Sequence, residues 1–155
     1  MEAEGLYSLK GEVEDEEFLI PIGEADTKRS GTDLTIITWN QQVHNCLEAA
    51  DVLAGEGIDA EVIDLRTIRP LDERAIFDSV CKTHRVVVVQ EGFPFAGVGA
   101  EISARIQEAC FDALDAPVLR VCNRDIPQPY ATNLEQHVIP TVQRILEACR
   151  AVCAR

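Results

Sequence analysis

The sequence predicts a three-layer αβα sandwich, built on a mostly parallel five-stranded sheet with one antiparallel edge strand. Three observations support this prediction. Apolar runs of strand length alternate with segments of helical periodicity. The run of four valines at 86–89 is typical of a strand that is covered on both faces. The turn SGTD at 30–33 is short enough to predict that the two strands beside it form an antiparallel pair.

The five strands are expected in apolar runs that are bounded by turn residues. The first is a short strand after residue 24, and the others lie at 34–39, 60–65, 85–91 and 116–122. Helices are expected at 43–53, 70–84, 100–114 and 140–153, where apolar residues recur at helical spacing. This βαβαβαβα order is typical of parallel strands with crossover helices.

Start and stop signals place some of the helix ends. Asn40 is a candidate N-cap for the first helix, and Gly55 or Gly57 lies near its end. Pro70 and Asp72 are start signals for the second helix, and Pro140 falls in the first turn of the last. The inner face of the second helix is predicted to carry Ile76, Val80 and Cys81.

Composition limits the classes of function. A chain of 155 residues is long enough for one domain with a real core. Its six cysteines form no CxxC pair and are expected to be reduced, small buried side chains. The net charge of -13 argues against a nucleic-acid partner, and no apolar run is long enough to span a membrane.

The acidic charge is concentrated at the start of the chain. Residues 1–17 contain seven acidic side chains and one lysine, a charge of -6. We expect 1–17 to be a flexible acidic connector and 18–155 to be the domain. The segment FLIPIG at 18–23 is too apolar to remain in water, so order is predicted to begin there.

Ligands of an open parallel sheet gather beyond the carboxyl ends of its strands, where this chain has a glycine-rich loop. Its glycines do not form a GxGxxG motif, and a nucleotide site is not predicted. Gly97 and Gly99 are expected to bring the next helix close to the sheet and to leave free amides for an anion or a partner's carboxylate. Glu91 is a candidate acid or base if buried, and otherwise caps a loop amide or pairs with an arginine.

Arg66 and Arg69 follow the 60–65 strand at the same edge, and three roles remain open. They could bridge Asp64, Asp72 or Glu91 and fix the turn, contact a neighbouring subunit, or hold an anion. The three histidines lack metal-ligand spacing, and no nucleophile motif is present. The residues by themselves therefore indicate a binding or assembly scaffold.

Several motifs carry a resemblance to a known family. EVIDLRTIRPLD at 61–72, KTHRVVVVQEGFPFAGVGAEI at 82–102, LDAPVLRV at 114–121 and RDIPQPYATNLEQHVIPTV at 124–142 resemble the C-terminal domain of the β subunit of the pyruvate dehydrogenase decarboxylating component. The resemblance runs from about residue 6 to the last helix and implies a transketolase C-terminal fold. The branched-chain 2-oxo acid dehydrogenase β subunit is similar too. Phe93 and Gln128 depart from the family, which usually has tryptophan and methionine there.

The resemblance implies an assembly domain of a thiamine-dependent oxidoreductase that acts on pyruvate. This chain alone is expected to bind no cofactor and to be inactive, because thiamine diphosphate and magnesium are held by other domains of the full enzyme. The implied partners are the α subunit, a second β subunit and the peripheral subunit-binding domain of the dihydrolipoyl acyltransferase. Neither nucleic acid nor membrane is expected. The implied compartment is a bacterial cytoplasm or a mitochondrial matrix.

Asp115 is the residue that the resemblance places at the acyltransferase contact, and its alternative role is a simple turn before the next strand. Glu108 and Asp112, on the preceding helix, would enlarge the same acidic face. The competing hypothesis is an independent anion- or metabolite-binding module. Such a module would hold a phosphorylated ligand through Arg66, Arg69 and the amides of Gly97 to Gly99.

Overall fold

The computed structural model describes residues 6–7, 9–12 and 15–154. Five strands form one sheet in the order β1-β3-β2-β4-β5: β1 (Asp26–Arg29), β2 (Leu34–Thr38), β3 (Ala60–Asp64), β4 (Val86–Val89) and β5 (Leu119–Val121). The helices are α1 (Gln42–Gly55), α2 (Glu73–Thr83), α3 (Val98–Cys110), α4 (Thr132–Glu135) and α5 (Val142–Cys153). A 3-10 turn, η2 (Phe111–Ala113), follows α3.

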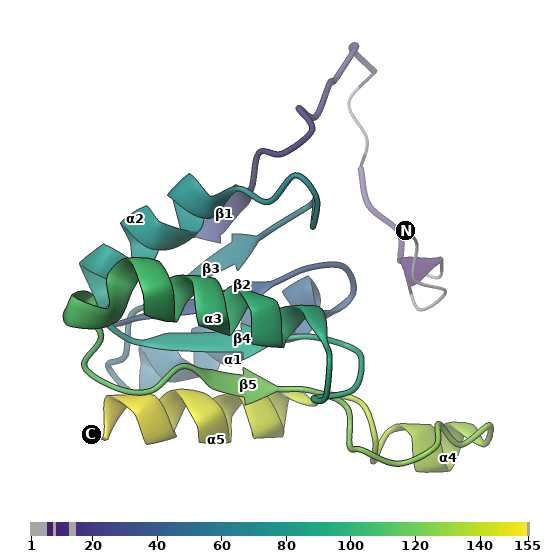
Figure 1. Cartoon of the computed structure of the whole chain (residues 1–155). Coiled ribbons are helices and arrows are strands. Elements are labelled where there is room, and N and C mark those ends of the chain that lie inside the picture. Colours follow the sequence, from purple (N-terminus) through teal and green to yellow (C-terminus); the bar gives the residue numbers. More distant parts are fainter. Residues whose placement is uncertain (1–5, 8, 13–14, 155) are drawn as a thin grey trace.

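The predicted three-layer sandwich is confirmed, because α2 and α3 cover one face of the sheet and α1 and α5 cover the other (Figure 1). Successive residues of a strand point to opposite faces of the sheet, so the side chains of each strand pack into two separate hydrophobic cores, one on each face. Val87 and Val89 pack on the α1 and α5 side, and Val86 and Val88 pack on the α2 and α3 side. The four valines are all buried, as their uninterrupted run predicts.

The predicted pairing of the first two strands is wrong. β1 is antiparallel to β3, whereas β2 lies between β3 and β4 and is parallel to both. The turn therefore carries the chain across the start of β3, where the amides of Thr32 and Asp33 donate to the Asp59 carbonyl. Gly31 permits the crossing, because a Cβ there would lie 2.3 Å from the Ala60 carbonyl carbon. The predicted antiparallel edge strand is present with a different neighbour.

The start signal of α2 and the end signal of α1 are confirmed, since α1 ends at Gly55, whereas the start signal of α1 is wrong. Asp72 is the N-cap of α2 and accepts a hydrogen bond of 3.0 Å from the Ala75 amide. Asn40 is not the N-cap of α1: that position belongs to Gln41, and Asn40 has a left-handed backbone with φ 61°. Cys81 is exposed and not on the inner face of α2.

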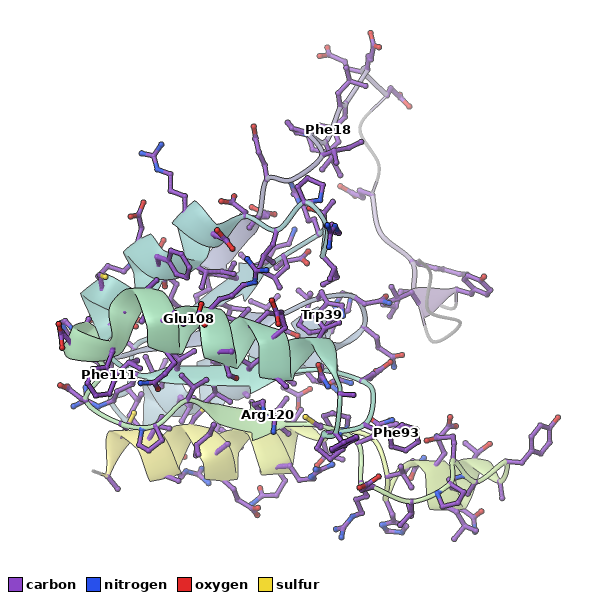
Figure 2. The ribbon with its side chains drawn as sticks, in the orientation of Figure 1. Phe18, Trp39, Phe93, Glu108, Phe111 and Arg120 are labelled. Atoms are coloured by element: carbon purple, nitrogen blue, oxygen red, sulfur yellow. The ribbon has the colours of Figure 1, made fainter. Side chains whose placement is uncertain are left out.

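The apolar segment 18–22 is also more exposed than predicted. Leu19 and Ile22 are 77% and 80% exposed, and Phe18 points away from the sheet (Figure 2). The residues that follow are tied to the domain, because a Cβ at Gly23 would lie 2.8 Å from Pro70 and the Ala25 amide donates to Asp72 over 2.9 Å. The expected connector, 1–17, falls partly outside the described residues and stays a prediction.

Candidate functional site

The loop after β3 is organised by Arg66. In the register of β1 and β3, Asp26 lies opposite Asp64, and two facing carboxylates repel each other. Arg66 engages both: a terminal nitrogen of its guanidinium lies 2.7 Å from Asp26 Oδ2, and its amide donates to Asp64 Oδ1 over 3.1 Å. The predicted bridging role of Arg66 is thus present, with Asp26 as the guanidinium partner and not Asp64, Asp72 or Glu91.

Asp26 is shared by a second cation, since Lys28 Nζ lies 2.6 Å from the same oxygen. The hydrogen bond from Lys28 lowers the pKa of Asp26, burial raises it, and the charges of Lys28 and Arg66 lower it again. The net pKa is below the ordinary value of 3.8. Asp26 is therefore ionised at neutral pH and fixes Arg66 in place.

Arg69 behaves differently from Arg66. It is exposed, and among the described residues no carboxylate lies within ion-pair distance of its guanidinium. The predicted structural bridge by Arg69 is therefore wrong. Both arginines line one hollow of about 630 Å³ at the carboxyl ends of β2 and β3. The rest of its wall comes from Trp39 and Asn40 after β2, Asp64, Thr67 and Ile68 around the end of β3, and the segment Ile20, Pro21 and Ile22.

The glycine-rich loop after β4 is closed by Gln90. Gln90 Oε1 accepts a hydrogen bond of 2.6 Å from the Gly99 amide, and its Nε2 donates to the Phe93 carbonyl over 3.1 Å. A Cβ at Gly97 would lie 2.3 Å from Gln90 Nε2. The predicted close approach of α3 to the sheet is confirmed. The predicted free amide is wrong for Gly99, because Gln90 occupies the place of an anion.

Glu91 is exposed and accepts a hydrogen bond of 2.6 Å from Gln42 Nε2. Its partner is a side-chain amide from α1, so the predicted loop amide or arginine is not the group it binds. Exposure also removes the condition under which Glu91 was a candidate acid or base.

An acidic surface lies at the opposite end of the molecule, where α3 ends and β5 begins. We name it the α3 surface and define it as Glu108, Phe111, Asp112 and Asp115; Glu108 and Phe111 are labelled in Figure 2. Asp115 Oδ2 lies 3.1 Å from an Arg85 guanidinium nitrogen, and its amide donates to the His84 carbonyl over 2.9 Å. The predicted turn role of Asp115 is therefore present, while its predicted role at the acyltransferase contact stays a prediction.

Phe111 is the part of the α3 surface that the sequence interpretation missed. It is 65% exposed and, with Leu114 and Asp115, borders a hollow of about 440 Å³. Glu108 and Asp112 are exposed too, and neither has an ion-pair partner among the described residues. An aromatic residue at the end of a predicted helix, next to unpaired acidic residues, was the available signal.

A buried carboxylate was also missed. Glu61 on β3 accepts hydrogen bonds from Lys82, Ser79 and the Gly31 amide, the last over 3.3 Å. Burial raises the pKa of Glu61, and these hydrogen bonds outweigh that effect and lower it. Since its partners are all groups of this chain, the cluster ties α2 and the 30–33 turn to the sheet.

Comparison with known proteins covers nearly the whole chain. The family model described as "Transketolase, C-terminal domain" matches residues 23–145. The mitochondrial pyruvate dehydrogenase E1 component subunit beta of Dictyostelium discoideum is 48% identical over all of this chain and 45% of its own length. The mouse protein of that name is 50% identical over 93% of this chain and 40% of its own length. The resemblance to this β subunit is therefore confirmed.

A bacterial relative gives the same picture: the E1 component subunit beta of Rhizobium meliloti is 44% identical over 99% of this chain. The chain spans less than half the length of these curated relatives. Among solved structures, a split-gene transketolase described as an inactive β4 tetramer has a TM-score of 0.78 at 24% identity, over 93% of this chain and 46% of its own. That likeness confirms the fold.

None of the helices in the described ranges is long and apolar enough to cross a membrane.

Proposed function

Because the chain belongs to the transketolase C-terminal domain family, we propose that it is the assembly domain of the β subunit of a thiamine diphosphate-dependent pyruvate dehydrogenase. The identity of 44–50% to β subunits over nearly the whole chain supports this assignment. The full enzyme would be an oxidoreductase that decarboxylates pyruvate within a 2-oxo acid dehydrogenase complex. Its α subunit and a second β subunit are the proposed neighbours of this domain.

The described residues offer no site that fits thiamine diphosphate. In the described part of the chain, no three acidic, histidine or cysteine side chains gather to hold magnesium. The start of α3 offers no cradle for a diphosphate, since Gln90 occupies the Gly99 amide. We therefore assign the cofactor to the rest of the enzyme and derive no catalytic step from this domain.

The compartment is proposed from the relatives. Those of Dictyostelium discoideum and mouse are named as mitochondrial, and that of Rhizobium meliloti is from a bacterium. A mitochondrial matrix or a bacterial cytoplasm is the proposed location.

The α3 surface is the proposed docking site for the basic peripheral subunit-binding domain of the acyltransferase. Glu108 and Asp112 form no ion pair in the described chain, so both carboxylates are available to a basic partner. Phe111 adds an exposed aromatic ring, the kind of side chain that anchors protein interfaces. Acidic side chains around the exposed ring of Phe111 support a contact that forms fast and weakens with salt.

The test is a calorimetric titration of this chain with an isolated peripheral subunit-binding domain at two salt concentrations. We expect saturable binding that weakens with salt, and a further loss of at least tenfold in Asp115→Ala. Asp125→Ala is the matched control, because Asp125 is an exposed aspartate in the β5–α4 connection, outside the α3 surface. A melting curve of Asp115→Ala separates lost docking from lost folding, since Asp115 also pairs with Arg85. Binding that is indifferent to salt and to Asp115→Ala would contradict the proposal.

A further inference from the structure

We propose that the hollow between the 66–69 loop and the 20–22 segment binds a small organic anion that carries a carboxylate on an apolar body. The site lies beyond the carboxyl ends of β2 and β3, at the opposite end of the sheet from the α3 surface. It is independent of the assembly role, so either proposal can fail alone.

The hollow is built into the fold. The 20–25 segment is fastened to the loop by the Ala25 amide, which donates to Asp72 over 2.9 Å, and by Gly23, which packs on Pro70. Asp72 is at the same time the N-cap of α2. The two sides of the hollow are thus joined through Asp72 at the base of the loop. Its volume of about 630 Å³ is in the range of small-molecule sites.

Charge makes the hollow selective for anions. Arg69 lacks a carboxylate within ion-pair distance in the described chain, and Arg66 uses a terminal nitrogen for Asp26 and so retains other N–H donors. Asp26 is itself shared with Lys28. The charged residues that line the hollow are Arg66, Arg69 and Asp64, which sum to +1 in a chain with a net charge of -13. The lining is therefore positive, whereas the chain as a whole is acidic.

Two residues that line the hollow after β2 and β3 have a left-handed backbone. Asn40 has φ 61° and Arg66 has φ 53°, and they follow the neighbouring strands β2 and β3. Asparagine tolerates this conformation, whereas at an arginine it is uncommon and costs stability. His84 and Ala96, which do not line the hollow, have it too. At Arg66 the conformation is held by the Asp64 carboxylate, which accepts the Arg66 amide.

The wall chemistry selects the body of the ligand. Ile20, Ile22 and Ile68 provide aliphatic surface, and Trp39 provides a half-buried aromatic face. A hydrated ion without an apolar part would not cover these apolar side chains, which would stay in contact with water. A planar carboxylate matches the fork of the Arg69 guanidinium, so a short-chain carboxylate satisfies both the charge and the wall.

Trp39 provides a direct readout, because it is the only tryptophan in the chain and lines the hollow. The experiment is a titration of Trp39 fluorescence with hexanoate, alongside hexanamide, which has the same body without the charge. We expect a saturable hexanoate signal at a concentration at least tenfold below that for hexanamide. Arg69→Ala should weaken hexanoate binding at least tenfold, and Arg69→Lys by less.

The matched control is Arg74→Ala, which removes the same charge from a side chain that is 92% exposed and outside the hollow. Hexanoate binding by this variant should equal that of the unaltered chain. The proposal is overturned if hexanoate gives no saturable change, if hexanamide binds equally well, or if Arg69→Ala binds as the parent does. A signal from inorganic phosphate with none from hexanoate would overturn the carboxylate assignment.

Discussion

The loops after β3 and after β4 leave the same edge of the sheet. The polar groups of the β4 loop are hydrogen-bonded within the loop, whereas the β3 loop leaves the Arg69 guanidinium without an ion pair among the described residues. After β4, Gln90 closes the loop from within by binding the Gly99 amide and the Phe93 carbonyl. After β3, Arg66 is fixed at the edge of a hollow and Arg69 extends beside it without a carboxylate partner in the described residues. A glycine-rich loop therefore need not be the loop that binds a ligand. A side chain from the preceding strand can fill the place that a ligand would take.

The largest expected effect is at Gly97, where the closed loop has no space for a methyl group. In Gly97→Ala the new Cβ would lie 2.3 Å from Gln90 Nε2 and 2.5 Å from the Phe93 carbonyl oxygen. Overpacking of this kind costs about 1–3 kcal/mol, and we expect a loss near the upper value in chemical denaturation. Gly55→Ala is the control, because no atom lies within 4 Å of its Cβ position. Equal free energies of unfolding for the two variants would mean that the loop is open.

A smaller loss is expected when the closing side chain itself is replaced. Gln90→Leu keeps the volume but leaves the buried Gly99 amide without its acceptor. An unsatisfied buried group costs about 1–3 kcal/mol in unfolding free energy. Gln107→Leu makes the same change at an exposed position of α3 and should be nearly neutral. A neutral Gln90→Leu would show that solvent already reaches the start of α3.

The smallest effects are expected at the open loop, where the two arginines should differ. Arg66→Ala removes a partner of Asp26 and should cost up to about 1 kcal/mol of unfolding free energy at neutral pH. Because the pKa of Asp26 is lowered in the folded state, this contribution is present above 3.8, its ordinary value, and is lost as the pH falls through the folded-state pKa. The difference between Arg66→Ala and the parent should therefore shrink in acid.

Arg69→Ala provides the comparison within the same loop. It should leave the melting temperature unchanged at both pH values, since Arg69 makes no ion pair in the described chain. A loss of several degrees in Arg69→Ala would instead give Arg69 a structural role and weaken the contrast between the two loops. The measurement is the melting temperature of Arg66→Ala, Arg69→Ala and the parent at neutral and acid pH.

The layers of the fold were predictable because they follow from local periodicity. The valine run of β4 and the Asp72 cap of α2 need only a few neighbouring residues to be recognised. The partner of β1 was not predictable in this way. A tight turn usually joins paired strands, but Gly31 packs on the backbone of Ala60 and carries the chain over β3. That contact joins residues 29 positions apart in the sequence and leaves no local pattern.

In the candidate site too, the features that follow from local sequence were predictable and those that depend on distant contacts were not. The sequence placed Arg66 and Arg69 at the carboxyl edge of the sheet, and the structure places both in one hollow. The Asp26 partner of Arg66 lies 40 residues away and depends on the β1 to β3 register, so it could not be chosen from the neighbouring carboxylates. Gln90 was visible as a polar residue directly after a buried apolar strand, and this was the unused signal for the closed glycine loop.

The two outermost strands, β1 and β5, have features that disfavour polymerisation of the sheet. β1 has only four residues, three of them charged, and its pairing with β3 is irregular between Thr27 and Arg29. β5 has three residues, and Arg120 reaches from it to the Pro94 carbonyl over 2.8 Å. Short, charged and irregular strands are poor templates for another chain's backbone. The edges of this sheet therefore disfavour the addition of a strand from another chain, and the helices and loops are the surfaces left for contacts that saturate.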